Sequence, residues 1–282
     1  MAKIIDGKAI SAEIRGEIRQ EVEAFTSEHG YAPSLTVIIV GEDPASQVYV
    51  KNKEKAAAAV GIRSDVIRLP EETDEETLLS TIDRCNSDRS VHGILVQLPL
   101  PRHINEKNVI CRIAPEKDVD AFGYENVGRI LTGDFDFLPC TPSGVMELLA
   151  RSGIDLSGKE CVVLGRSNIV GKPMAALLMH KNATVTVCHS KTKDIASHTR
   201  RADVIVSAVG HAGFVKPDMI KEGAVIIDVG INRTADGKLT GDADFEGCFD
   251  KCSAITPVPG GVGPMTVTML LKNTLTAAKK QI

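Results

Sequence analysis

The sequence predicts an α/β protein made of two lobes, each built on a largely parallel sheet. Short apolar runs of strand length alternate along the chain with longer stretches of helical periodicity, which is the βαβ pattern. The chain has 282 residues, enough for about two domains. Proline, glycine and aspartate become frequent between 115 and 142, where no long periodic segment occurs, so we expect a domain junction there.

The first half begins with a predicted helix over 7–29, where apolar residues repeat at helical spacing and Gly30 follows. Strands are then expected at 35–40, 65–69 and 93–98, and helices at 44–60 and 73–85. The strand Leu35–Val40 is a continuous apolar run. Such a run is typical of a parallel strand that helices cover on both faces.

The second half repeats the alternation without repeating the sequence. Strands are expected at 161–164, 184–188, 203–208 and 224–229, and helical stretches at 174–180, 194–201 and 217–222. A hairpin turn is predicted at 235–238. The last segment, 266–279, is predicted to be a helix and follows an unusual run of prolines and glycines from Pro257 to Pro264.

Composition excludes several classes of function. The 33 Lys and Arg against 37 Asp and Glu leave a net charge of −4, without the broad basic surface that nucleic-acid binding requires. No run reaches the ~20 apolar residues of a membrane span, so no membrane association is expected and the protein is predicted to be cytoplasmic. The seven cysteines contain no CxxC pair, so neither a disulfide framework nor a zinc site is predicted.

A glycine loop follows the strand at 161–164. It runs from Gly165 to Pro173 and opens a helix, so its backbone N–H groups could approach a diphosphate at the positive helix end. The spacing fits neither GxGxxG nor a P-loop. A tight strand-to-helix turn without a ligand is the alternative reading of the same residues.

The end of the next strand favours NADP over NAD. An NAD site usually has an acidic residue there for the ribose 2′-OH, whereas this strand ends Cys188-His189-Ser190-Lys191. A cation and a hydroxyl, Arg166 and Ser190, instead suit a 2′-phosphate. Two further strands end in Gly210 and Gly230, where a cofactor would cross the sheet edge, although turn formation alone also explains these glycines.

Lys53 is the first candidate for proton transfer. It lies four residues after Tyr49 and in line with Ala56 and Ala57, on the face of the predicted helix that reads as apolar. A partly desolvated amine suits proton transfer near neutral pH. The alternative is a lysine whose aliphatic stem covers the edge of the core.

Asp118 and Asp120 are the second candidate, in the predicted junction. Paired carboxylates can serve acid–base chemistry or hold a metal, but aspartates in a loop more often form turns. No third ligand is obvious nearby, so no metal is predicted.

Taken together, these motifs resemble the bifunctional methylenetetrahydrofolate dehydrogenase/methenyltetrahydrofolate cyclohydrolase family (the FolD family). The one departure is Ala121, where the family commonly has glycine; Asp120 before it is kept. The matching stretches are 49–61, 93–101, 115–120, 141–144, 165–173, 188–192, 228–232 and 257–270.

The resemblance implies two α/β lobes that flank a cleft. A catalytic, folate-binding domain would comprise 1–140 and 265–282, and a Rossmann-type NADP domain 141–264, with the chain crossing between lobes twice, at 141–152 and 257–268. The implied reactions are NADP-dependent oxidation of 5,10-methylenetetrahydrofolate and hydrolysis of the product to 10-formyltetrahydrofolate. The implied partners are tetrahydrofolate one-carbon derivatives and a second copy of the chain, paired through the cofactor lobe.

The resemblance also assigns residues. Lys53 would be the catalytic residue of hydrolysis with Gln97 hydrogen-bonded to it, Tyr49 would flank the substrate, and Asp120 would bind the pterin edge. Substrate-lining residues would also include Pro257, Gly260 and Gly261. The cofactor-binding residues would be Gly165, Arg166, Ser167, Ser190 and Ile231.

Two other interpretations of the sequence remain open. One is a different two-lobed NADP-dependent dehydrogenase, similar to shikimate dehydrogenase, and the other is a module that senses NADP without chemistry. Neither requires the set Tyr49, Lys53, Gln97 and Asp120.

Overall fold

The structure is a computed structural model that describes residues 2–234 and 236–282. Its contacts divide the chain into two units: unit 1 contains the N-terminal residues up to Ala12 and Pro139–Thr266, and unit 2 contains Glu13–Leu138 and Val267–Ile282. The chain therefore passes between units three times rather than the expected two, because α1 (Gly7–His29) already contributes to both units. The functional domain limits at 140/141 and 264/265 stay a prediction.

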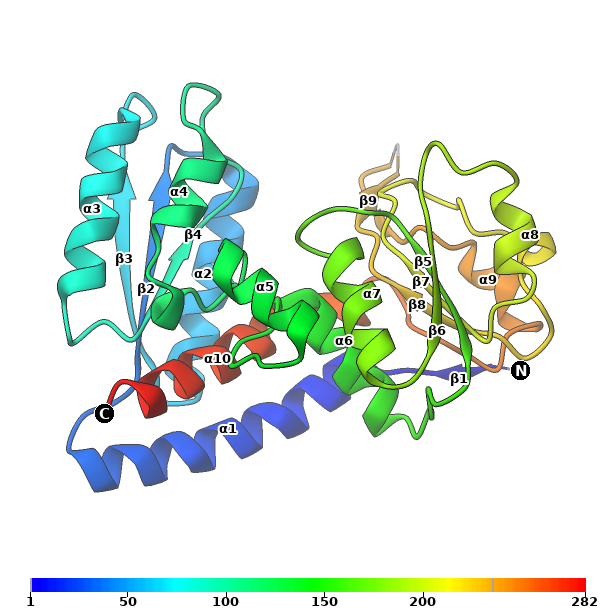
Figure 1. Cartoon of the computed structure of the whole chain (residues 1–282), viewed down its shortest axis with the longest axis horizontal. Helices are drawn as coiled ribbons and strands as arrows, with labels where there is room; N and C mark the ends of the chain where they lie inside the picture. Colours follow the sequence, from blue (N-terminus) through cyan, green and yellow to red (C-terminus); the bar gives the residue numbers. More distant parts are fainter. Residues whose placement is uncertain (1, 235) are drawn as a thin grey trace. The chain divides into compact units, whose positions relative to one another are not determined.

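Unit 2 is built on a three-stranded parallel sheet in the order β3-β2-β4. The strands are β2 (Ser34–Val40), β3 (Arg63–Leu69) and β4 (Gly93–Val96). The helices between them are α2 (Pro44–Ala59) and α3 (Glu75–Ser87), and α4 (Glu106–Arg112) follows β4 (Figure 1). Because the chain moves to one side of β2 and then to the other, right-handed crossovers place α2 and α3 on opposite faces.

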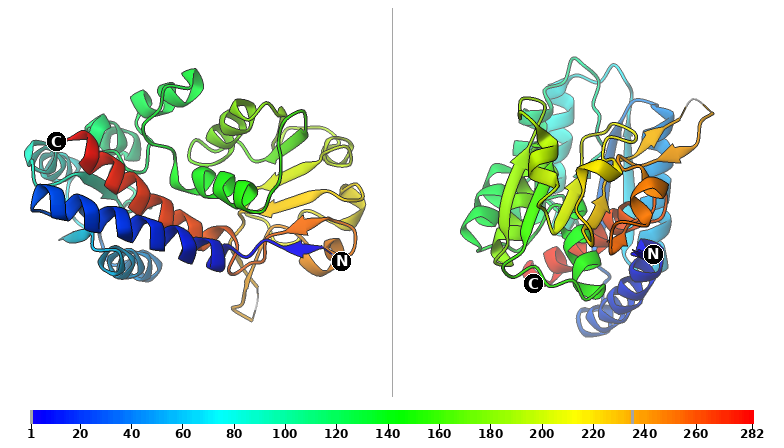
Figure 2. Two further views of the ribbon diagram at one scale, coloured as in Figure 1. Left: turned by 90° about the horizontal axis from the view of Figure 1, so that it is seen from below. Right: turned by 90° about the vertical axis from the view of Figure 1, so that its right-hand side faces the viewer.

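Two long helices complete unit 2. The later part of α1 runs beside α10 (Val262–Lys280), as Figure 2 shows. Arg15 Nε donates to Thr268 Oγ1 at 2.8 Å, and Lys279 pairs with Glu21 at 2.6 Å. The predicted return of the final helix to the first lobe is thus confirmed, although α10 begins four residues before Thr266 and includes Pro264 in its first turn. Proline is tolerated there because the first turn has no acceptor for its N–H.

Unit 1 is built on a six-stranded parallel sheet in the order β1-β11-β8-β7-β5-β6. The strands are β1 (Lys3–Ile4), β5 (Glu160–Leu164), β6 (Thr184–Cys188), β7 (Val204–Ser207), β8 (Val225–Asp228) and β11 (Ala254–Ile255). The helices are α6 (Cys140–Arg151), α7 (Gly171–His180), α8 (Ile195–Thr199) and α9 (Phe245–Phe249).

The connections of this sheet create a switch in direction. The chain leaves β5 through α7 to reach β6 on one side, and α8 then returns it to β7 on the other side of β5. In open α/β sheets, ligands bind outside the carboxyl ends of the two strands that flank such a switch point. The α/β class and the Rossmann-type second lobe predicted from the sequence are confirmed.

Several short elements differ from the prediction. The helix expected at 217–222 is only a 3₁₀ turn, η2 (Pro217–Met219), and η1 (Pro115–Lys117) is another. The junction contains α5 (Tyr124–Thr132), a helix too short to produce a clear periodicity. Strands β9 (Asn232–Arg233) and β10 (Leu239–Thr240) pair antiparallel, while the predicted turn at 235–238 includes residue 235, outside the described residues.

In the described part of the chain, none of the helices is both long enough and apolar enough to cross a bilayer.

Candidate functional site

Unit 2 brings Lys53 and Gln97 together at the carboxyl edge of its sheet. Lys53 is in the middle of α2, and Gln97 directly follows β4. Lys53 Nζ donates to Gln97 Oε1 at 3.0 Å. The Gln97 side chain is held in turn, because its Nε2 donates to the Leu98 carbonyl at 2.5 Å. Its oxygen is therefore the atom that faces the lysine.

The surroundings of Lys53 explain why its place on the helix was ambiguous. Val50, Ala56 and Ala57 of α2 are buried, whereas Lys53 is half-buried at the border of that buried face. Tyr49 was expected in line with the apolar residues, but 47% of it is exposed. One helical turn before the lysine, its ring is thus available to a ligand.

The two junction aspartates have different surroundings. Asp118 is buried and accepts hydrogen bonds from Gly123 N at 2.8 Å and Asn126 Nδ2 at 3.0 Å. Burial, with a smaller contribution from the charge of Asp120, raises the pKa of Asp118. Asp120 is only partly buried, and both aspartates line a small cavity of unit 2 together with Phe122. Asp118 shapes the loop, and Asp120 is the more exposed of the two carboxylates.

Lys117 is a buried residue that sequence reasoning missed. Its Nζ donates to the carbonyls of Cys85 at 3.0 Å and Asp88 at 2.7 Å, so it satisfies carbonyl groups at the end of α3. Burial lowers the pKa of this amine. On the other side of Asp120, the buried Ala121 has a φ of 56°, in the left-handed region. For Lys117, the sequence showed only a lysine adjacent to the aspartates, and no helical or strand periodicity there indicated that its side chain is buried.

Clusters of three or more His, Cys, Asp or Glu side chains that could hold a metal ion do not occur among the described residues. Six of the seven cysteines are buried, as expected for small apolar side chains, and Cys111 is exposed.

In unit 1, Gly165 and Gly171 allow the loop after β5 to fold tightly onto α7. Gly165 has a φ of 116°, and a Cβ there would lie 2.4 Å from the Ala208 carbonyl oxygen. A Cβ on Gly171 would lie 2.3 Å from the Gly165 carbonyl oxygen. Both distances are too short for any side chain, so these positions require glycine.

This loop fits a diphosphate. Ser167 Oγ accepts from the N–H groups of Val170 at 3.2 Å and Gly171 at 3.3 Å, which fixes the start of α7. The backbone N–H groups of 166–169 donate to no group within the described residues. Unpaired backbone donors at a helix N-terminus attract phosphate oxygens.

The other predicted cofactor residues are exposed at neighbouring strand ends. Arg166 lies in the loop itself, and Ser190 lies in a turn after β6 where Thr192 N donates to the His189 carbonyl at 2.8 Å. Ile231 follows β8 and is 53% exposed. The strands β5, β6 and β8 thus each present a predicted cofactor residue at the carboxyl edge of one sheet.

The predicted substrate segment 257–261 belongs to unit 1, and its glycines make a close approach to the chain itself. Lys8 N donates to the Gly260 carbonyl at 3.0 Å, and a Cβ on Gly7 would lie 1.8 Å from the Gly261 carbonyl oxygen. Pro257 is partly buried beside them. The glycines were expected because a ligand needs room. In the structure, a Cβ on Gly261 would lie 2.6 Å from the Pro257 carbonyl oxygen, and one on Gly260 would lie 3.3 Å from Lys8 Cε, so neighbouring residues already occupy that room. The contact with substrate stays a prediction.

Comparison with known proteins finds one family over both halves of the chain. Residues 5–120 match the family model described as "Tetrahydrofolate dehydrogenase/cyclohydrolase, catalytic domain". Residues 139–282 match "Tetrahydrofolate dehydrogenase/cyclohydrolase, NAD(P)-binding domain". The bifunctional protein FolD of Geotalea daltonii is 58% identical, with 100% of each chain covered.

Solved structures are also similar over the whole length. The bifunctional FolD enzyme of Campylobacter jejuni is 50% identical, with a TM-score of 0.98 and 100% of both chains covered. The Trypanosoma brucei enzyme, solved with NADP and an inhibitor, is 45% identical, with a TM-score of 0.95 and coverage of 99% and 98%.

The shikimate-dehydrogenase-like alternative is not favoured. The shikimate 5-dehydrogenase of Thermus thermophilus is 17% identical, with a TM-score of 0.53 over 87% of this chain and 98% of that one, a likeness of fold alone. Both halves of the chain instead match the models of one family, and the chain belongs to the tetrahydrofolate dehydrogenase/cyclohydrolase family.

Proposed function

We propose that this chain oxidises 5,10-methylenetetrahydrofolate with NADP and hydrolyses the resulting 5,10-methenyltetrahydrofolate to 10-formyltetrahydrofolate. The predicted enzyme class, a bifunctional dehydrogenase and cyclohydrolase, is confirmed by the family. The predicted cofactor agrees with the family's NAD(P)-binding domain. The assignment of individual residues to steps is our proposal.

The hydrogen bond between Lys53 and Gln97 is the observation that carries the hydrolytic step. In hydrolysis, water adds to the bridging carbon of the methenyl cation, one C–N bond of the bridge breaks, and a proton leaves. An amine that alternates between its charged and neutral forms can move that proton. Gln97 Oε1 takes one N–H of Lys53 at 3.0 Å and so leaves the remaining positions of the amine for water and substrate.

Asp120 and Tyr49 supply recognition rather than proton transfer. A partly exposed carboxylate can accept two hydrogen bonds from the amino-pyrimidine edge of a pterin, and such charge-assisted bonds are strong. The exposed ring of Tyr49 offers an apolar surface on the same helix as Lys53. Support for this division comes from burial: Asp118 is almost fully buried and accepts from Gly123 N and Asn126 Nδ2, whereas Asp120 is partly exposed.

The oxidation step needs position more than catalysis by side chains. When bound, NADP accepts a hydride from the bridging carbon, and the neighbouring folate nitrogen stabilises the cation that forms. The protein's part is to hold the cofactor through the loop 165–170 and the strand ends. Arg166 and Ser190 would bind the 2′-phosphate, so NADP should bind more tightly than NAD in a titration with both; a preference for NAD contradicts this role.

The test of the proposed function is a two-stage absorbance assay on the purified protein. In the first stage, 5,10-methylenetetrahydrofolate and NADP are mixed with enzyme, and we expect reduced cofactor to appear. In the second, the decay of 5,10-methenyltetrahydrofolate is followed without cofactor, and we expect it to exceed the uncatalysed rate. Reduction without faster decay contradicts the hydrolytic role of Lys53, and neither signal contradicts the proposed function as a whole.

We further propose that the protein is a homodimer that pairs through unit 1. β6 is the edge strand of its sheet, and Val187 on that strand and Met179 on α7 are 37% and 54% exposed. An open edge strand with apolar side chains is a natural pairing surface. Light scattering should give about twice the 30.2 kDa chain mass, and a monomer contradicts the proposal.

The cytoplasm is the compartment that the free cysteines favour, because disulfides are rare where thiols are kept reduced. Cell fractionation with an antibody against the protein tests this location.

A further inference from the structure

Asp242 lies at the centre of a dense hydrogen-bonding network in unit 1. Its side chain is 0% exposed. Oδ2 accepts from the backbone N–H groups of Val209 at 2.7 Å and Gly210 at 3.2 Å. Oδ1 accepts from His211 N and from Asn232 Nδ2, both at 2.9 Å. One buried carboxylate thus connects the loop after β7 with the residues after β8.

Three successive backbone N–H groups, those of 209–211, converge on this carboxylate. Such concave sets of backbone donors usually bind a phosphate or another anion. Here the anion is a side chain of the protein, so the loop keeps its curved shape without a ligand. The buried Ser207 hydroxyl also donates to Asp242 Oδ2, at 3.3 Å.

Asp228, the last residue of β8, holds Asp242 in place through the backbone. Its Oδ1 accepts from Asp242 N at 2.9 Å, and its Oδ2 accepts from Ala243 N at 2.7 Å. Two glycines make room for the pair. A Cβ on Gly230 would lie 2.2 Å from Asp242 Oδ1, and one on Gly241 would lie 2.0 Å from Asp228 Oδ2. The glycine after β8 therefore has a packing cause beyond turn formation.

The segments that Asp242 holds are those that adjoin the proposed cofactor site. Ala208, directly before the held loop, is the residue whose carbonyl approaches Gly165. Ile231, the exposed residue assigned to the cofactor, directly precedes Asn232, whose amide is bound to Asp242. The loop after β7 also lies at the switch point between β5 and β7. Asp242 itself lies beneath these segments and reaches no ligand.

We propose that Asp242 is a positioning residue for NADP: it fixes the loop 208–211 and, through Asn232, the exposed Ile231, in the arrangement that receives the cofactor. The inference rests on the proposed function, since it assumes that NADP binds at this sheet edge. An isosteric amide at this position turns a donor toward backbone N–H groups and so disrupts the loop while keeping the volume.

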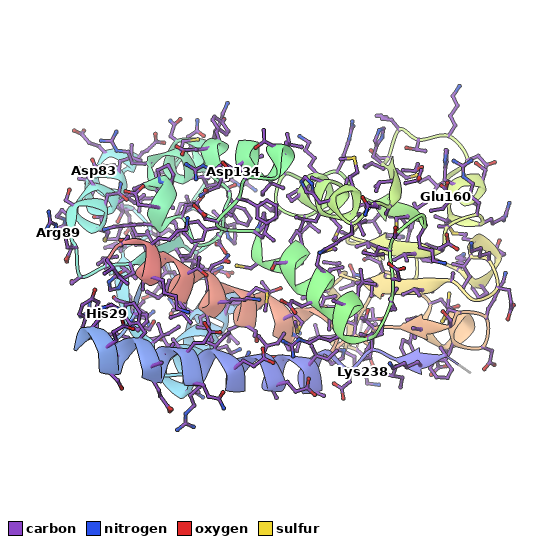
Figure 3. The ribbon with its side chains drawn as sticks, turned by 60° about the horizontal axis from the view of Figure 1, so that its bottom comes forward. His29, Asp83, Arg89, Asp134, Glu160 and Lys238 are labelled. Carbon is purple, nitrogen blue, oxygen red and sulfur yellow. The ribbon has the colours of Figure 1, made fainter. Side chains whose placement is uncertain are left out.

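The test compares Asp242→Asn with a matched control, Asp203→Asn. Asp203 is also a carboxylate of unit 1 that accepts from backbone, at Glu160 N (2.8 Å; Glu160 is labelled in Figure 3), but it precedes β7 and so lies at the opposite edge of the sheet. We expect Asp242→Asn to raise the KM for NADP about tenfold or more, from the loss of several hydrogen bonds to a buried charge. Hydrolysis of 5,10-methenyltetrahydrofolate without cofactor should stay within about twofold of wild type, because the residues proposed for it lie in unit 2. Asp203→Asn should leave both unchanged.

Three results separate the possibilities. A wild-type protein that does not bind NADP overturns the proposed function and not the role of Asp242 alone. A folded Asp242→Asn protein with an unchanged KM for NADP, or with equal losses in both activities, overturns the positioning role. If Asp242→Asn does not fold, Asn232→Ala removes one donor only; a several-fold rise in the KM for NADP with unchanged hydrolysis supports the role, and an unchanged KM overturns it.

Discussion

The two units place their candidate sites at the same kind of position, the carboxyl edge of a parallel sheet, but build them from different atoms. In unit 2 the site consists of side chains, above all Lys53, Gln97 and Asp120. In unit 1 it consists mainly of backbone, shaped by glycines at 165 and 171 and by a buried carboxylate. Chemistry at unit 2 should therefore depend on single functional groups, and binding at unit 1 on close backbone approach.

The largest expected effect is on the side-chain site. Lys53→Met should reduce the hydrolysis of 5,10-methenyltetrahydrofolate by about 10³-fold or more, because general acid–base catalysis contributes about 10² to 10⁴. NADP binding by unit 1 should not change. The exposed Lys55 of the same helix offers the control Lys55→Met, which removes an equal charge and should retain activity. Hydrolysis at the wild-type rate in Lys53→Met removes this residue from the mechanism.

In unit 1, the stability of the folded state should depend on pH through Asp228. Burial, and to a lesser degree the charge of Asp242, raises the pKa of Asp228 from 3.8 to about 6, although three backbone N–H groups oppose the shift. The native state then holds the proton more tightly than the unfolded state. Stability from this group is complete below about pH 4 and falls by about 3 kcal/mol as pH rises to about 6.

Urea unfolding of wild type and Asp228→Asn at several pH values measures this dependence. The stability of wild type relative to the variant should decrease between pH 4 and pH 7. For Asp203, the hydrogen bond from Lys221 lowers the pKa, so its stabilisation is present above the ordinary value and lost in acid. Asp203→Asn should therefore show little change relative to wild type between pH 4 and pH 7 and the opposite slope below about pH 4. Equal slopes for both variants between pH 4 and pH 7 contradict this assignment.

Gly165→Ala tests close backbone approach. The new Cβ would lie 2.4 Å from the Ala208 carbonyl oxygen at a φ of 116°, so loop or strand must shift. We expect the Kd for NADP to rise about 30-fold, equivalent to about 2 kcal/mol of backbone strain. Gly158→Ala is the control: its φ is 70° but nothing lies within 4 Å, so it should cost some stability and no affinity. Comparable NADP binding by both variants argues against the glycine loop as the phosphate site.

The smallest of these effects concerns folate recognition. Asp120→Ala should raise the KM for 5,10-methylenetetrahydrofolate about tenfold, as expected for the loss of hydrogen bonds to a charged group. The KM for NADP should remain as in wild type. Asp134, exposed after α5 and labelled in Figure 3, provides the control Asp134→Ala. An unchanged folate KM in Asp120→Ala means that the pterin edge binds elsewhere.

Local patterns in the sequence predicted the regular elements well. The helix α1 has the predicted bounds, and β2 differs from the prediction by one residue, because apolar periodicity over these segments is strong. Helices α4 and α5 were missed because seven and nine residues are too few to reveal a period. Whether an element could be predicted thus depended on the length of its periodic segment.

Interactions between distant residues could not be predicted from patterns of this kind. The Lys53–Gln97 bond joins residues 44 positions apart, and its placement came from resemblance to a family. The Asp228–Asp242 pair joins the end of β8 to a later segment through backbone contacts. Nothing in the local sequence around Asp242 indicates which strand ends will converge on it. Lys117 was missed for the same reason, since its partners lie about 30 residues earlier, at the end of α3.

Ala121 shows how a position beside a functional residue can vary without a change in stability. Its left-handed φ costs about 1 kcal/mol relative to glycine. Its fully buried methyl group returns about 0.8 kcal/mol, and glycine would also add entropy to the unfolded chain. These contributions nearly cancel, so replacement by glycine is close to neutral for folding. A change in activity on Ala121→Gly would therefore report on the backbone that positions Asp120 and not on a loss of stability.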